Sequence, residues 1–253
     1  MLNNMKIGKR LAVGFGLVLL LLLVVGGTGY WGITSSTGTT IAMLQGDAQV
    51  AEHSARARAN VLGLRRFEKD LFLNVGNKEK EAEYLKKWKE QQEHLTARLA
   101  DLEKVAIQAK DKEMVNSMKK DLADYDEGFK RVYNQVDLGQ IKTPQEGNQA
   151  IGQYKDEMHR LEQLAQDLAT EGQTRMEAKE QIMKDLARHT MLIMVITILL
   201  AVAASFAIGT FITRSIVNPL GVAVGIANKL SAGDLTTNVE ATSGDEVGQL
   251  LAA

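Results

Sequence analysis

An uncharged apolar stretch at residues 191–213 constrains this chain more than any other feature. Its sequence is MLIMVITILLAVAASFAIGTFIT, and Arg214 follows it. An α-helix rises about 1.5 Å per residue and the hydrocarbon core of a bilayer is about 30 Å thick, so the stretch is long enough to span a membrane. We therefore predict a transmembrane helix over residues 191–213 and interpret the rest of the chain around it.

A second uncharged run, residues 11–33, follows the basic residues Lys6, Lys9 and Arg10. Basic residues before an apolar run mark the cytoplasmic side of a membrane. A cleaved signal peptide is the alternative, but its apolar region would be shorter and a small-residue cleavage site would follow. We expect an uncleaved transmembrane helix over residues 11–33, preceded by a cytoplasmic tail at residues 1–10.

These two spans fix the expected topology. With the N-terminus in the cytoplasm, residues 34–190 lie outside the membrane and residues 214–253 lie inside. Arg214 at the inner end of the second span agrees with this orientation, because positive residues favour the cytoplasmic side.

The composition excludes several kinds of function. A formal net charge of −1 gives no general attraction to nucleic acid. The absence of cysteine rules out disulfides, thiolate metal sites and cysteine nucleophiles. The four histidines are scattered and lack the spacing of a zinc site. We expect no nucleic-acid partner, no metal and no cofactor.

Residues 34–190 carry four helical patterns, each with apolar residues three and four positions apart, which is typical of a bundle seam. The clearest seam comprises Val115, Met118, Leu122, Tyr125, Phe129, Val132 and Val136. The others comprise Met43, Val50, Ala57, Val61, Leu64, Leu71 and Val75; Leu85, Trp88, Leu95, Leu99, Leu102 and Ala106; and Ile151, Tyr154, Met158, Leu161, Ala165 and Leu168.

Turn signals separate the four patterns. Gly76 is suited to the end of the first helix and Asn77 to the cap of the second. Thr143-Pro144-Gln145-Glu146 forms a capping box that begins the fourth, which then runs without a breaker into residue 191. Short turns favour antiparallel neighbours, so we predict an all-α, membrane-anchored antiparallel four-helix bundle over residues 34–190.

A shorter pattern follows the second span. Ile216, Pro219, Ala223, Ile226 and Leu230 mark one helix seam, and the motifs Gly233-Asp234-Leu235 and Asp245-Glu246 come next. Acidic residues stabilise the start of a helix, so a second helix is expected from Asp245.

Three of these motifs resemble a HAMP domain. They are Pro219-Leu220, Gly233-Asp234-Leu235 and Asp245-Glu246-Val247-Gly248-Gln249-Leu250, in the order and spacing of that family. The resemblance implies parallel coiled-coil helices over residues 214–253, with the second helix truncated by the end of the sequence. It also implies a signal relay through Pro219, Gly233, Asp234, Leu235, Asp245 and Glu246.

The whole chain is similar to the N-terminal half of methyl-accepting chemotaxis receptors. That resemblance implies a homodimeric receptor, not an enzyme, in the bacterial inner membrane, with a periplasmic or extracellular sensor domain. It implies a cytoplasmic kinase and an adaptor as partners, through a region absent from this sequence. Two alternatives stay open: the sensor half of a histidine kinase or cyclase, and a structural membrane coiled-coil protein.

Arginines on the first bundle helix are the candidate ligand residues. Arg58 and Arg65 are seven residues apart and share a helix face, where they could clamp a carboxylate or phosphate. In related receptors the first helix supplies arginines to a small acid, so we expect an anionic small-molecule ligand. The full predicted set is Arg58, Arg65, Arg66 and Lys69, with Trp88 and Tyr154 added by antiparallel register.

Two other interpretations of this arginine cluster were open. It could be a solvated face with pairs four residues apart, and buried Glu68 could take Arg65 or Arg66 as its partner.

Small residues in the spans permit close helix approach and hence dimerisation; they are Ala12, Gly16, Ala201, Ser205 and Gly209. Ligand binding would shift the fourth helix and the second span by about 1–2 Å, a common scale for helix switching.

Overall fold

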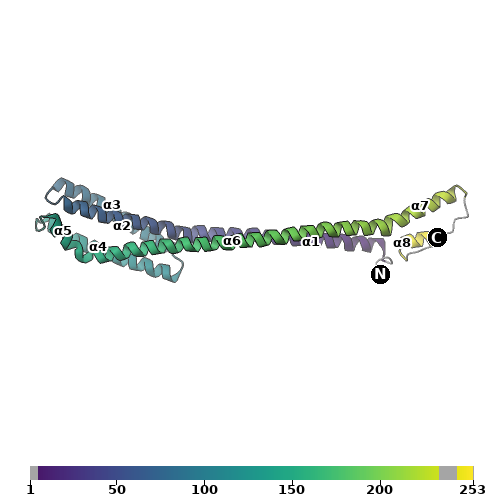
Figure 1. The fold of residues 1–253 in the computed structure, drawn as a ribbon, viewed down its shortest axis with the longest axis horizontal. Helices are drawn as coiled ribbons and strands as arrows, with labels where there is room; N and C mark the ends of the chain where they lie inside the picture. Colours follow the sequence, from purple (N-terminus) through teal and green to yellow (C-terminus); the bar gives the residue numbers. More distant parts are fainter. Residues whose placement is uncertain (1–4, 234–243, 253) are drawn as a thin grey trace. The chain divides into compact units, whose positions relative to one another are not determined.

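The computed structural model describes residues 5–233 and 244–252, and no strand occurs among them. The all-α prediction is confirmed. The helices are α1 (Ile7–Ala42), α2 (Ala48–Leu73), α3 (Lys78–Val105), α4 (Ala109–Asp137), α5 (Pro144–Ala150), α6 (Lys155–Ile212), α7 (Asn218–Ser231) and α8 (Glu246–Ala252). Figure 1 labels these helices. The chain divides into two compact units: Thr37–Met183, here called the sensor unit, and Met1–Ser36 with Lys184–Ala253, here called the span unit.

The sensor unit is an antiparallel four-helix bundle. The amide of Asn60 on α2 bonds Gln91 on α3, Lys119 on α4 bonds Glu103 on α3, and Arg160 on α6 bonds Asp121 on α4. The predicted turn signals are present: Gly76 has φ of 92°, Asn77 caps α3, and the capping box of Thr143 and Glu146 begins α5. The sequence-derived bundle topology and the structure agree.

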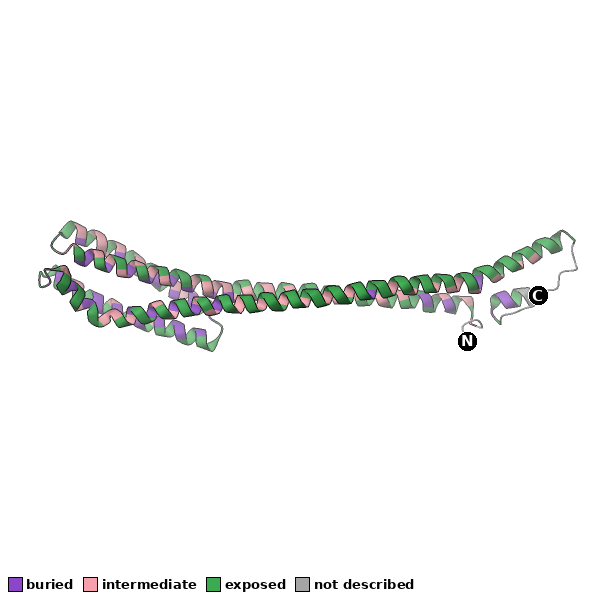
Figure 2. Cartoon of the chain, in the orientation of Figure 1, coloured by how far each residue is buried: buried purple, intermediate pink, exposed green. Residues whose placement is uncertain are grey.

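The bundle core consists of the predicted seams. Figure 2 shows buried residues along the facing sides of the bundle helices. Nearly all the predicted seam residues are buried, and Leu64, Leu71, Leu95, Met118, Tyr125, Ile151 and Leu161 are fully inaccessible to solvent. Burying side chains of this size contributes about 1.5–3 kcal/mol each, so the core is the main stabilising feature of the sensor unit.

The fourth bundle helix runs on from its capping box as predicted, but it contains a tighter segment that the sequence analysis did not predict. A 3₁₀ segment, Ile151–Tyr154, separates α5 from α6. Residues three apart eclipse each other in a 3₁₀ helix, so Ile151 and Tyr154 face the same way. Ile151 enters the core, and the Tyr154 ring packs directly on Gly128 of α4, where a β-carbon would overlap it. Packing of this pair accounts for the tighter turn.

A π-helical turn, Met43–Asp47, separates α1 from α2 and was also absent from the sequence prediction. A π-turn inserts an additional residue into the helix and changes which side chains face the neighbouring helices. Asp47, its last residue, is buried. A second π-turn, Thr213–Val217, separates α6 from α7 close to Pro219.

The span unit contains the two apolar stretches packed antiparallel. Gly14 of α1 lies against Ile208 of α6, and Gly32 lies against Thr190, so residue numbers rise on one helix as they fall on the other. Two helical segments, Ile7–Leu73 and Pro144–Ser231, are long and apolar enough to cross a membrane. Within the described residues Gly16 and Gly209 have no neighbour within 4 Å, so the close approach inside this chain falls at Gly14 and Gly32 instead.

Helix α7 carries its predicted seam on one face. Ile216 is buried and Pro219, Ala223 and Ile226 are partly buried, while Leu230 is exposed. Asp234 and Leu235, two of the predicted relay residues, lie outside the described residues. Gly233 ends α7 with φ of 89°, a left-handed conformation that favours glycine.

Candidate functional site

Arg58 and Arg65 of α2 converge on one carboxylate of α6. The Glu162 carboxylate lies 3.0 Å from Nη1 of Arg65 and 3.6 Å from Nη2 of Arg58. The Arg65 and Glu162 side chains are 28% and 20% exposed, so the cluster is open to solvent but partly sheltered. Two guanidinium groups share a single carboxylate here, which leaves one positive charge in excess on this face of the bundle.

The other predicted cations are not part of this cluster. Arg66 is mostly exposed, pairs with Asp70 at 3.8 Å and lies over the ring of Phe67 at 5.7 Å. This is the solvated pairing four residues apart that was the alternative interpretation. Lys69 lines a hollow of 280 Å³ between α2 and α5, together with Phe72, Leu73, Pro144, Gln145 and Asn148.

The two predicted aromatic residues pack on α4. Trp88 is buried and stacks on Phe129 with ring centroids 3.8 Å apart. Tyr154 packs on Gly128, as described above. The contacts described for these two rings therefore belong to the core around α4 and not to the open arginine cluster.

Glu68 has a partner that the sequence analysis did not anticipate. The alternative interpretation gave it Arg65 or Arg66, whereas the hydroxyl of Tyr125 on α4 donates a hydrogen bond to the buried Glu68 carboxylate. Burial raises the pKa of Glu68 above its usual value, and the hydrogen bond from Tyr125 opposes that rise only in part. The hydrogen-bond partner of Glu68 is thus Tyr125, and the ion-pair partner of Arg65 is Glu162.

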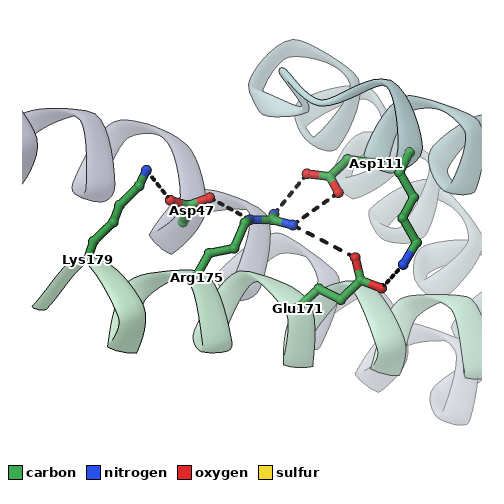
Figure 3. A network of polar contacts seen from close by, with 6 residues as sticks. Asp47, Asp111, Glu171, Arg175 and Lys179 are labelled. Carbon is green, nitrogen blue, oxygen red and sulfur yellow. Dashed lines mark hydrogen bonds and ion pairs between the residues drawn. The ribbon is translucent and has the colours of Figure 1, made fainter. Parts of the chain in front are cut away.

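A polar network at the opposite end of the sensor bundle was missed (Figure 3). Arg175 of α6 bonds Asp47 at 2.7 Å and Asp111 at 2.8 and 3.3 Å, and Lys179 bonds the other oxygen of Asp47 at 2.6 Å. Glu171 lies 3.8 Å from Arg175 and also pairs with Lys110. One guanidinium thus joins the start of α2, the start of α4 and the middle of α6.

The network depends on two local features. The π-turn that ends at Asp47 brings this carboxylate to α6, and the backbone of α6 approaches closely, since a β-carbon on Gly172 would lie 3.0 Å from the carbonyl of Asp47. Burial alone raises the pKa of Asp47, but the hydrogen bonds from Lys179 and Arg175 outweigh it and leave the pKa lowered. The like-charged pair Arg175 and Lys179, four residues apart on one helix, is the sequence signal that could have indicated an acidic partner.

Two of the predicted relay residues, Asp245 and Glu246, lie at the start of α8. Asp245 accepts a hydrogen bond from the backbone N–H of Gly248 at 3.0 Å, which caps the helix as predicted for an acidic start. Glu246 accepts from the backbone N–H of Ile7 at 2.9 Å. Pro219 stands in the first turn of α7, directly after the second π-turn.

Comparison with known families agrees with this architecture. The family described as a four helix bundle sensory module for signal transduction matches residues 4–190, and the HAMP domain family matches residues 211–253. The chain therefore belongs to the family of four-helix-bundle sensory modules for signal transduction, and the predicted resemblance to the N-terminal half of methyl-accepting chemotaxis receptors is confirmed. Both matched domains are non-catalytic sensory and signalling domains.

One curated relative is similar over a short segment. A protein of Acetivibrio thermocellus named "Putative sensory transducer protein" is 35% identical over 75 residues, which is 29% of this chain and 14% of that protein. The matched segment is thus a small part of the relative.

Proposed function

We propose that this chain is the sensory half of a homodimeric transmembrane chemoreceptor whose bundle binds a small anion such as an organic acid. The observation that carries the proposal is the convergence of Arg58 and Arg65 on Glu162. Guanidinium groups bind carboxylates and phosphates through paired, charge-assisted hydrogen bonds, and two of them on one face suit a small anion. The family match to sensory modules supports a receptor over a purely structural protein.

The proposed topology places the sensor unit outside a bacterial inner membrane and residues 214–253 in the cytoplasm. Support comes from the two apolar helices and from contacts that join the start of α1 to the start of α8, which put these two segments at the same end of the span unit. The output is a cytoplasmic kinase reached through an adaptor. A histidine kinase or cyclase module is the second candidate, because HAMP domains also precede such modules.

Binding is tested with the full chain in lipid nanodiscs, titrated calorimetrically with organic acids, amino acids and inorganic phosphate. Arg65→Ala removes the closer arginine and should weaken anion binding about tenfold or more, since hydrogen bonds to charged groups contribute about 1.5–3 kcal/mol. Glu162→Gln should preserve or strengthen binding, because it removes the carboxylate that competes with the ligand.

Arg56→Ala is the matched control for this titration. Arg56 lies on the same helix but pairs with Glu52 one turn earlier, so the variant removes the same charge outside the cluster. Equal affinity in Arg65→Ala, Arg56→Ala and the natural chain would contradict the arginine site. A small anion that binds equally well to all three would then occupy another part of the sensor unit.

Transmission is proposed to follow α6, whose residues Lys155–Ile212 form one uninterrupted α-helix. Three glycines inserted after Arg188 should uncouple the sensor from α7, because each glycine disfavours the helix by about 1 kcal/mol and adds flexible backbone. The readout is the ligand-induced change in labelling of a cysteine introduced at Gln249 in α8. A full ligand response in the glycine variant would refute transmission by the α6 helix.

A further inference from the structure

Three elements of the span unit meet at the side chain of Arg10, near the start of α1. Its Nη2 lies 2.5 Å from Oδ2 of Asp245, and its Nη1 lies 3.3 Å from the backbone carbonyl oxygen of Ser215. The Arg10 and Asp245 side chains are each 1% exposed. A buried guanidinium in the first helix therefore bonds both the π-turn Thr213–Val217 that follows α6 and the residue that caps α8.

The Ser215 carbonyl is available to Arg10 because of Pro219. In a regular α-helix the N–H of residue 219 would donate to the carbonyl of residue 215, but proline has no N–H. The π-turn Thr213–Val217 occupies the same place. Arg10 donates to this carbonyl from outside the helix, and so it replaces part of the hydrogen bonding that Pro219 removes.

Glu246 adds a second connection between α1 and α8. Its carboxylate accepts from the N–H of Ile7, one of the first-turn N–H groups of α1 that have no partner within the helix. This hydrogen bond lowers the pKa of Glu246. Asp245 and Glu246 thus each connect α8 to α1, one through the Arg10 side chain and the other through the backbone of Ile7.

Buried ion pairs add little net stability compared with apolar side chains of the same size, yet they fix register and orientation well. The Arg10–Asp245 pair is suited to the second role, because Arg10 presents several donors in a fixed plane. A lysine at this position is a point charge and cannot hold the carbonyl and the carboxylate with the same geometry.

We propose that the start of α1 takes part in signal transmission by the HAMP domain. In this proposal Arg10 couples movement of the Ser215–Pro219 junction to movement of α8. Movement of α6 then reaches α8 through Arg10 and Asp245 as well as along the chain through α7. The proposal rests on the HAMP assignment of residues 211–253 and is independent of the anion site in the sensor unit.

The contact itself is tested by spin-label distance measurement on the full chain in nanodiscs. The natural chain has no cysteine, so Gly8→Cys with Gln249→Cys gives two defined labels, and an excess of natural chain removes signals between subunits. We expect one narrow distance distribution, a broad one in Arg10→Leu, and a narrow one in Lys9→Leu. Lys9→Leu is the matched control, because it removes the same charge from the adjacent exposed position.

Coupling is tested by inserting one alanine after Val202, which rotates the following part of α6 by about 100° and advances it by about 1.5 Å. The maleimide labelling rate of Gln249→Cys should change at least about fivefold on insertion, the lower end of typical coupling. Arg10→Leu should reduce the change to less than about twofold and Arg10→Lys should leave an intermediate response, whereas Lys9→Leu should leave the response intact.

The charge-swapped variant Arg10→Asp with Asp245→Arg guards against a simple folding defect. Restoration of the narrow distance distribution and of at least part of the labelling response supports the proposal. If Arg10→Leu responds to the insertion as fully as Lys9→Leu does, the coupling role is wrong. A full response in Arg10→Lys would overturn the bridging role, and a swapped variant that is helical by circular dichroism but has no response would do the same.

Discussion

The sensor unit and the span unit differ in whether their apolar side chains are buried within the chain. In the sensor unit nearly all the seam residues of the four helices are buried within one chain. In the span unit long runs of leucine, isoleucine and valine stay exposed, and none of the described residues of α7 is buried. The sensor bundle thus buries its seams within one chain, whereas the exposed apolar residues of the span unit agree with the lipid environment and the homodimer proposed above.

Ion pairs show the reverse: they lie mostly at the surface in the sensor unit, whereas the span unit contains a buried one. Most ion pairs of the sensor unit have at least one exposed side chain, and such surface pairs contribute about 0–1 kcal/mol each. Arg175 is the main exception, because its side chain is only 19% exposed and its partner Asp111 is buried. In the span unit a buried ion pair, Arg10–Asp245, joins two helices far apart in sequence. Apolar packing determines the sensor fold, while polar contacts determine how the ends of the spans are joined.

The largest expected contrast comes from removing equivalent leucine side chains. Leu161→Ala removes a fully buried side chain of α6 in the sensor unit and should lower the free energy of unfolding by about 4 kcal/mol. Leu199→Ala, on the same helix but exposed in the span unit, should change it by less than about 0.5 kcal/mol. Thermal unfolding of the full chain in nanodiscs measures both. Equal losses would mean that Leu199 is packed by protein, as a second subunit would do.

A smaller loss in the free energy of unfolding is expected when the network around Arg175 is broken. Arg175→Met leaves Asp111 buried without its bidentate partner, and breaking a buried pair costs about 3 kcal/mol or more. Arg131→Met is the control, because Arg131 pairs with Glu127 of the same helix and both side chains are 66% exposed. If the two variants unfold at the same temperature, the network is no more than a set of surface ion pairs.

This network also predicts a response to acid. The pKa of Asp47 is lowered in the folded chain, so its ion pairs stabilise the fold above the unfolded value of 3.8, and this stabilisation is lost as pH falls through the lowered folded pKa. Asp47→Asn should therefore reduce the slope of stability against pH in that acidic range. An unchanged slope would show that other carboxylates govern acid unfolding.

Glycine positions offer a third contrast between the units. Gly128→Ala places a methyl group into the Tyr154 ring and should cost about 2 kcal/mol, since overpacking typically costs 1–3 kcal/mol. Tyr154→Leu in the same chain should recover part of this loss by making room. Gly209→Ala meets no neighbour within 4 Å among the described residues and should leave a monomer unaffected. Weaker self-association of Gly209→Ala in sedimentation experiments would place Gly209 at the dimer contact.

The sequence predicted the bundle well because its signals are local and periodic. The seam of α4 from Val115 to Val136 and the capping box at Thr143 depend on neighbours three or four residues away, and the structure confirms both. The two π-turns and the 3₁₀ segment were not predicted, because they depend on contacts between helices, such as Tyr154 on Gly128.

Ion-pair partners were the least predictable feature of the chain. Arg58 and Arg65 could be placed on one helix face, but Glu162 as their shared partner depends on the register of α6 against α2. Arg10 and Asp245 are 235 residues apart, so helical periodicity carries no information about their contact. Partners of this kind follow only from the assembled three-dimensional fold.

The smallest expected effect concerns Glu68, a carboxyl group inside the otherwise apolar sensor core. Its pKa is raised by burial, so the folded chain holds the proton more strongly, and this contribution to stability is lost as pH rises from 4.5 through the raised folded pKa. Glu68→Gln keeps an acceptor for the Tyr125 hydroxyl and removes the titration. We expect it to match the natural chain near pH 4 and to be more stable than the natural chain at pH 8, because the natural chain loses the stabilisation from the Glu68 proton over that range.

The control for this prediction is Tyr125→Phe, which keeps the ring and leaves Glu68 without its donor. It should destabilise the chain at pH 8, where the carboxylate is charged, more than at pH 4. Unfolding midpoints in urea at the two pH values test both variants. A stability curve for Glu68→Gln parallel to that of the natural chain would show that Glu68 ionises freely, and the sensor core would then be more accessible to water than its packing indicates.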